Sequence, residues 1–231
     1  VMETASGGAD TVRPHETDFP HLVAWRAGWE RDRRAAARRT WIDRCAAVRD
    51  WPVYEAAEVN PVDHRVAILP EGAEAGFVEA MQAAGVTVAA GLARILQDLP
   101  EARAGLLGVL VDGREAAGFG GVFAPMAATL PLVVDAGRRG DLAAIQHGLD
   151  TAIDGYPFTL SMLEEGLRES GRLSERERAA FVTLSVEQPM AVPVIGGRRG
   201  RWLREINGAL RREDTKTVFP LALNVEIDPQ G

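Results

Sequence analysis

Two identical Gly-Arg-Arg-Gly segments form the most specific repeat in the chain, and each could bind an anion. They occupy residues 137–140 and 197–200, and each follows an apolar run and precedes a helical pattern. A glycine turn, two guanidinium groups and a helix start together bring donors for a phosphate or carboxylate to one point. The alternative is a pair of flexible surface loops with solvated arginines. The anion hypothesis names four ligands: Arg138, Arg139, Arg198 and Arg199.

Two acidic side chains are candidates for proton transfer. Glu71 follows the apolar run 65–69, and Asp112 ends the run 106–111. In an open parallel sheet, both would lie at the carboxyl edge of the strands, where ligands bind. Desolvation or a neighbouring carboxylate can raise the pKa of such an acid enough for it to act as a general base. The alternative is that each is an ordinary turn or helix-cap residue.

One cluster near the start of the chain has the composition of a metal site. His15, Asp18 and His21 lie within seven residues, and two imidazoles with a carboxylate can bind zinc or non-haem iron. The spacing is not that of H-E-x-x-H, and Pro14 and Pro20 argue against one continuous helix. A divalent transition metal is therefore a candidate cofactor, and plain surface groups are the alternative.

Several specific ligand motifs are missing from the sequence. There is no G-x-x-x-x-G-K-[ST] and no G-x-S-x-G, and residues 118–121 do not complete a G-x-G-x-x-G. The sequence therefore has no P-loop, dinucleotide fingerprint or nucleophile elbow. The single cysteine, Cys45, falls on the apolar stripe of an expected helix, which favours a core side chain over a nucleophile. One cysteine also excludes an internal disulfide framework and suits a reducing cytoplasm.

The middle of the chain has the pattern of an α/β protein. Continuous apolar runs at 65–69, 86–89 and 106–111 alternate with helical patterns at 73–84 and 92–103. Such runs are typical of parallel strands with helices on both faces, so we expect a β-α-β-α-β unit. Further expected elements are a strand at 130–134, helices at 141–154 and 158–170, a helix beginning at the capping box 174–177, and an edge strand at 221–227.

The segment from 18 to 60 combines a helical pattern with aromatic and basic side chains. Residues 25–50 hold eight arginines and four acids, together with Trp25, Trp29 and Trp41. The tryptophan stripe with opposite arginines fits a core-packed helix with a solvated face, and an interface with a partner or a second copy is the alternative. A net charge of −7 makes nucleic acid an unlikely partner of the whole surface.

Together these patterns predict one α/β protein of 231 residues. Residues 1–17 form a flexible arm, and 18–60 form a helical segment packed on 61–231, a mostly parallel three-layer sheet domain with a C-terminal edge strand. The first functional hypothesis is an enzyme acting on a small anionic metabolite by acid/base or metal-assisted chemistry. The second is a non-catalytic binding or regulatory module that docks a protein partner or self-associates through its N-terminal helix.

The expected location is the cytoplasm. The first residues, Val1 to Thr4, have neither a basic nor an apolar segment of a signal peptide. Residues 116–134 form an uncharged stretch of about the length that spans a bilayer, but glycines and prolines interrupt it. We therefore expect no membrane span there.

Overall fold

The computed structural model confirms a mixed α/β protein. It describes residues 19–47, 54–55, 70, 72–98, 106–119, 126–133, 140–180, 182–187, 194–195, 198–199 and 221–226. The main sheet has four strands in the order β3-β2-β5-β8. These strands are β2 (Leu106–Asp112), β3 (Ala127–Val133), β5 (Val182–Glu187) and β8 (Leu221–Glu226). β3 is antiparallel to β2, whereas β5 is parallel to β2 and β8 is parallel to β5.

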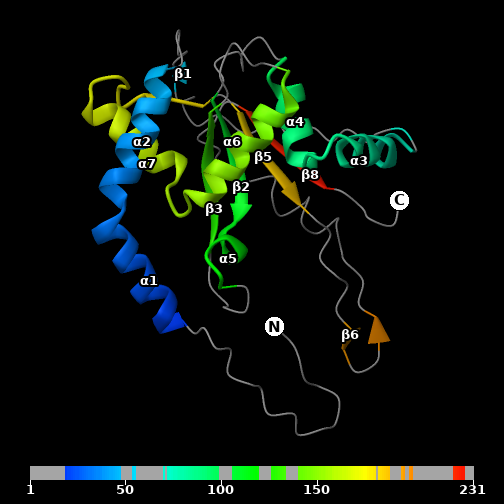
Figure 1. Cartoon of the computed structure of the whole chain (residues 1–231), viewed down its shortest axis with the longest axis horizontal. Helices are drawn as coiled ribbons and strands as arrows, with labels where there is room; N and C mark the ends of the chain where they lie inside the picture. Colours follow the sequence, from blue (N-terminus) through cyan, green and yellow to red (C-terminus); the bar gives the residue numbers. More distant parts are fainter. Residues whose placement is uncertain are drawn as a thin grey trace, which may run out of the picture.

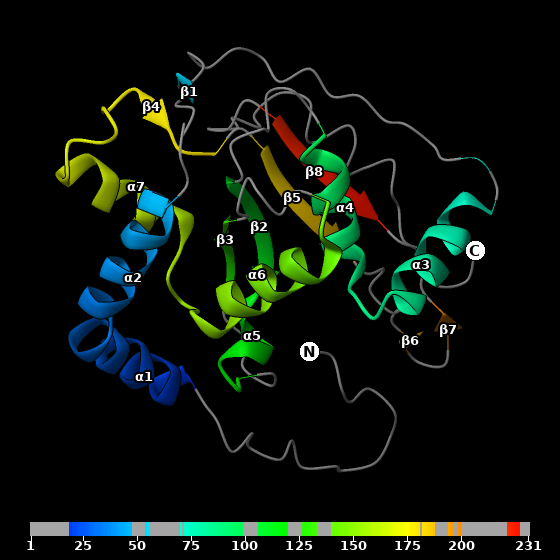
Figure 2. The same cartoon turned by 45° about the horizontal axis from the view of Figure 1, so that its top comes forward.

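One face of this sheet is apolar and covered by helices. Alternate residues of each strand share a face, which places Leu107 and Val109 of β2 beside Leu132, Val182 and Leu184. The helices α4 (Val88–Leu96) and α6 (Leu142–Asp154) pack on these side chains. Both helices lie over the same face of the sheet (Figures 1 and 2).

A small residue sets how closely α6 approaches this face. A Cβ at Gly148 would lie 2.8 Å from Leu132 Cδ1, so a larger residue there would have to displace Leu132 or move the helix away from the sheet.

The opposite face is only partly covered. Helix α7 (Leu160–Glu169) packs over the beginning of β2, where Leu106 is buried and a Cβ at Gly108 would lie 3.0 Å from Leu160 Cδ2. Two residues further along β2, Leu110 is 40% exposed although its strand has a neighbour on each side. The carboxyl end of β2 is therefore accessible from this face.

Two helices form the N-terminal part of the described chain. They are α1 (Phe19–Asp32) and α2 (Arg34–Ala47), which meet at Arg33. Trp29, Trp41 and Cys45 are buried, and the Trp41 ring stacks on Phe158 with centroids 6.1 Å apart. These side chains therefore belong to the core, as a stripe at helical spacing predicts.

Ion pairs join α2 to α7 outside this core. Arg34 Nη2 lies 2.8 Å from Glu165 Oε2, and Arg38 pairs with Glu169 one turn further along both helices. Two of the arginines opposite the buried stripe, Arg34 and Arg38, thus join α2 to α7 through ion pairs.

The prediction of a strand at 86–89 is wrong, because Val88 begins α4. Thr87 is the N-cap of this helix, and its hydroxyl accepts a hydrogen bond from Ala90 N. Ala90, Ala93 and Leu96 then repeat at helical spacing and are all buried. The cap and this period override the strand preference of a few β-branched residues. Without this strand, the expected β-α-β-α-β unit is not formed, and the run 65–69 lies outside the described residues.

The helix expected after the capping box is also missing. Ser174 N donates to Glu177 Oε2 at 2.6 Å, which is one of the two hydrogen bonds of a capping box. Glu177 and Arg178 nevertheless form a short strand, β4 (Glu177–Arg178), that pairs antiparallel with β1 (Tyr54–Glu55). The edge strand predicted at 221–227 is present as β8, and it runs parallel to its neighbour.

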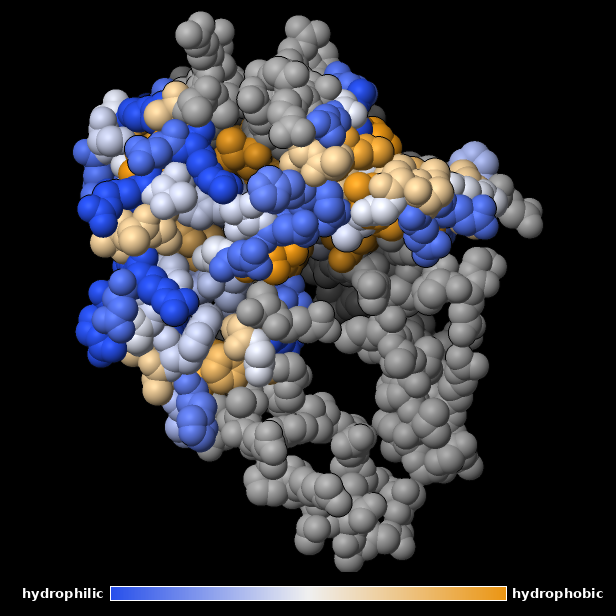
Figure 3. Space-filling view, in the orientation of Figure 1, coloured by the Kyte–Doolittle hydropathy of each residue, from blue (hydrophilic) through white to orange (hydrophobic). Residues whose placement is uncertain are grey.

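Helix α3 (Ala73–Ala83) has no buried residue and rests on α4. The Phe77 and Met81 side chains lie where a Cβ of Gly91 would be, and apolar surface gathers over these two helices (Figure 3). In the described part of the chain, no single helix is long and apolar enough to cross a membrane. The bent pair α3 and α4, at 104°, meets those criteria only when taken together.

Candidate functional site

The structure describes only some of the candidate site residues that the sequence predicts. Asp112 and His21 have described side chains, whereas Arg198 and Arg199 are described only as the backbone of β7 (Arg198–Arg199), which pairs with β6 (Val194–Ile195). The anion and metal hypotheses therefore stay predictions. The remaining candidates lie outside the described residues: Glu71, Arg138, Arg139, His15 and Asp18.

Asp112 has a local structural role at the end of β2. Its Oδ1 accepts from Arg114 N at 3.0 Å, and its Oδ2 lies 2.5 Å from Arg114 Nη1. The carboxylate thereby caps the short helix α5 (Gly113–Ala116) and pairs with a cation that the same helix carries. Because Arg114 engages both oxygens, this geometry supports the turn-and-cap interpretation better than that of a general base.

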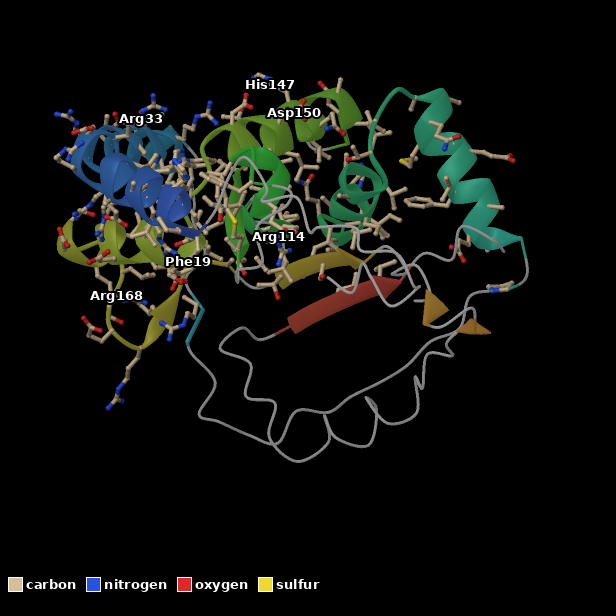
Figure 4. All side chains as sticks on the ribbon, turned by 90° about the horizontal axis from the view of Figure 1, so that it is seen from below. Phe19, Arg33, Arg114, His147, Asp150 and Arg168 are labelled. Atoms are coloured by element: carbon tan, nitrogen blue, oxygen red, sulfur yellow. The ribbon has the colours of Figure 1, made fainter. Side chains whose placement is uncertain are left out.

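The histidines of the described residues do not gather into a metal site. His21 is exposed on α1, and no group of three or more His, Cys, Asp or Glu side chains that could hold a metal occurs within the described ranges. His147 and Asp150 lie on the outer side of α6, away from the sheet (Figure 4). Asp150 accepts a hydrogen bond from Gln146 there, at 2.8 Å.

A concave site lies beside the accessible end of the sheet, and we call it the β3 recess. It has a volume of about 180 Å³. Its walls come from α1, the beginning of β3 and the turn that leads into α7. The lining residues are Arg26, Met126, Ala127, Ala128, Thr129, Tyr156, Pro157, Thr159 and Ser161.

Tyr156 is the best-fixed side chain of this recess. Its hydroxyl donates to the Met126 carbonyl at 3.1 Å, and its ring stacks on Trp25 with centroids 6.1 Å apart. The ring also lies against Gly113, where any Cβ would overlap it. Burial raises the pKa of Tyr156, and the positive charge of Arg26 opposes this shift.

The register places the recess next to the open part of the sheet. Thr129 is the cross-strand partner of Leu110, and Ala127 is the partner of Asp112. Residues on the recess wall and on the exposed end of β2 therefore form one continuous surface.

Sequence reasoning missed the residues of the recess. Arg26 is one of eight arginines between 25 and 50, and Tyr156 belongs to no motif. The only local sequence signal is Gly113, the turn glycine directly after Asp112. It does not indicate that the ring of Tyr156 packs against this position.

Comparison with known proteins finds similarity in structure alone. No protein-family model and no curated protein sequence matches the chain. The structure is similar to SgcC5 from Streptomyces globisporus in complex with (R)-(-)-1-(2-naphthyl)-1,2-ethanediol and sucrose. In that comparison the TM-score is 0.61 and the identity 17%, over 94% of this chain and 52% of that one.

Two condensation domains are also similar. The first condensation domain of the CDA synthetase gives a TM-score of 0.55 at 21% identity, over 76% of this chain and 40% of that one. A mutant starter condensation domain of rhizomide synthetase RzmA, in complex with C8-CoA and Leu-SNAC, gives 0.50 at 18%, over 77% and 42%. These likenesses show a shared fold, and the chain spans about half the length of the structures it matches, or less.

Proposed function

We propose that the chain forms one lobe of a condensation-domain-like enzyme, which joins an acyl group and an aminoacyl group that are carried as thioesters. The observation that carries this proposal is the coverage: 94% of the chain corresponds to only 52% of SgcC5. In these structural neighbours, the part that matches this chain is only about half of the protein, or less. The two ligands named for the rhizomide synthetase domain suggest the substrate class.

The reaction proposed for the assembled enzyme balances without a further reactant. The amine of the aminoacyl thioester attacks the carbonyl carbon of the acyl thioester. The new carbon–nitrogen bond replaces the carbon–sulfur bond, and the leaving thiolate takes the proton lost by the amine, which gives the free thiol. The two bound substrates have to meet at a surface that both lobes can reach. On the present lobe, we place this surface at the exposed carboxyl end of β2 and the adjoining β3 recess.

Binding of Leu-SNAC and of C8-CoA to the purified chain tests the proposal, with ligand-observed NMR as the measurement. We expect Leu110→Glu, which adds a charge to the open sheet end, to weaken binding of at least one ligand by about tenfold or more. Ile95→Glu is the matched control, because Ile95 is another exposed large apolar side chain and lies on α4. Absence of binding for both ligands at millimolar concentration, or equal losses in the two variants, would contradict the proposal.

A second candidate function is a non-catalytic α/β module that docks a protein partner or a second copy. The exposure of Leu110 in an internal strand favours it, because such a surface is normally covered. Native mass spectrometry separates the two functions. A module of this kind would change its assembly state in Leu110→Glu without binding either thioester.

The earlier hypothesis of a small anionic metabolite gripped by the arginine loops stays a prediction. The only nominated proton-transfer residue with a described side chain is Asp112, and Arg114 engages both of its oxygens. The described geometry therefore does not favour proton transfer by Asp112.

A further inference from the structure

We propose that the β3 recess binds a phosphate group, with the guanidinium of Arg26 as its principal ligand. This inference goes beyond the proposed function and does not depend on it, because any phosphate-bearing molecule of suitable shape could use the recess.

The charge of the lining is the first argument. No acidic residue is among the described residues that line the recess, although the chain as a whole carries a net charge of −7. Arg26 is the cation of the lining, and it takes part in no ion pair among the described residues. Asp112, the carboxylate at the end of β2, is engaged by Arg114. Glu30, one turn further along α1, pairs with Arg34. An arginine in a concave wall that forms no ion pair with a described acid is available for an anion, and its planar fork matches a phosphate.

The hydroxyl groups of the lining are the second argument. Thr129, Thr159 and Ser161 all contribute to the wall. The Thr159 oxygen accepts from Met162 N, which fixes this side chain while its own hydrogen stays available for donation. Three hydroxyl-bearing residues and one arginine in the same lining suit a ligand with several acceptor oxygens.

The rigidity of the recess is the third argument. Tyr156 forms one wall of the recess. Its hydroxyl donates to the Met126 carbonyl, and its ring stacks on Trp25 and packs against Gly113. A wall fixed in this way requires little ordering when a ligand binds. Its volume of about 180 Å³ can hold a phosphate group with a short substituent.

The test is a titration of the purified full chain with inorganic phosphate, followed by phosphorus NMR and isothermal calorimetry. We expect saturable binding that Arg26→Gln weakens by about tenfold or more. Arg33→Gln is the matched control, because Arg33 is an exposed arginine that follows the same helix and does not line the recess. Ser161→Ala should weaken binding by a smaller factor, and all three variants should keep the melting temperature of the wild type.

Three results would overturn the inference. The first is no saturable binding of phosphate, and the second is an equal effect of Arg26→Gln and Arg33→Gln. The third is acetate binding as tightly as phosphate, because a site for a single carboxylate does not need the hydroxyl groups. Binding of Leu-SNAC, which carries no phosphate, is measured separately, so a failure here is distinguishable from failure of the proposed function.

Discussion

Removal of the Glu164 carboxylate should destabilise the protein far more than removal of its sequence neighbour. Glu164 is 5% exposed on α7, and its Oε1 accepts from Ala179 N at 2.9 Å. Its Oε2 lies 3.4 Å from Arg168 Nη2 and 3.9 Å from Arg178 Nη1. Glu164→Ala leaves a buried N–H without a partner and takes the carboxylate from two guanidiniums, so we expect a loss of about 3 kcal/mol in the free energy of unfolding.

Two further variants separate the hydrogen bond from the charge. Glu164→Gln keeps an acceptor for Ala179 N and removes the charge, so its loss should be about 1 kcal/mol. Glu165→Ala breaks the pair with Arg34 at a side chain that is 51% exposed, and it should cost less than about 1 kcal/mol. Urea unfolding followed by tryptophan fluorescence measures all three. Equal losses for Glu164→Ala and Glu165→Ala would refute the reasoning.

Three other predictions concern packing and titration. Gly113→Ala should cost about 1–3 kcal/mol because its Cβ overlaps the Tyr156 ring, and Tyr156→Ala in the same chain should recover part of that loss. Gly76→Ala on α3, where a Cβ meets no atom within 4 Å, should instead raise stability by about 0.5–1 kcal/mol. Burial raises the pKa of the Cys45 thiol to about 12, so it should resist alkylation at pH 8 until the chain unfolds. Since the unfolded thiol ionises near pH 9, stability should also fall as the pH rises from about 9 towards 12. Melting curves and thiol labelling measure these effects, and rapid labelling of the native protein would contradict the third.

The sequence predicts the helices of this protein better than its sheet. The helix expected at 141–154 is present as α6, because Asp141 is a strong N-cap and the buried stripe of Ile145 and Leu149 has one clear period. At 86–89 the local preference of valine points to a strand, whereas Thr87 as a cap and the apolar stripe beyond it favour a helix. The outcome there depends on packing against β5 and α6, which no local pattern contains.

The candidate site was less predictable than the fold for the same physical reason. Asp112 was found because an acid after an apolar run is a local pattern, but Arg114 two residues later engages its oxygens. The β3 recess joins Arg26, Thr129 and Tyr156, which are far apart in the sequence and meet only through tertiary packing. Position along the chain therefore gave no indication that these side chains share one surface.

The pairing of β8 beside β5 has a consequence for how the protein folds. Both parallel pairings of the main sheet join residues distant in the sequence, such as Gly108 with Thr183 and Leu184 with Leu223. The antiparallel pairing of β2 with β3 closes a much shorter loop, so its entropy cost is lower. We therefore expect β2 and β3 to associate early, and the two parallel pairings, of β5 with β2 and of β8 with β5, to form later. Until β8 arrives, the hydrogen-bonding edge of β5 is exposed, and aggregation during refolding should compete at this stage.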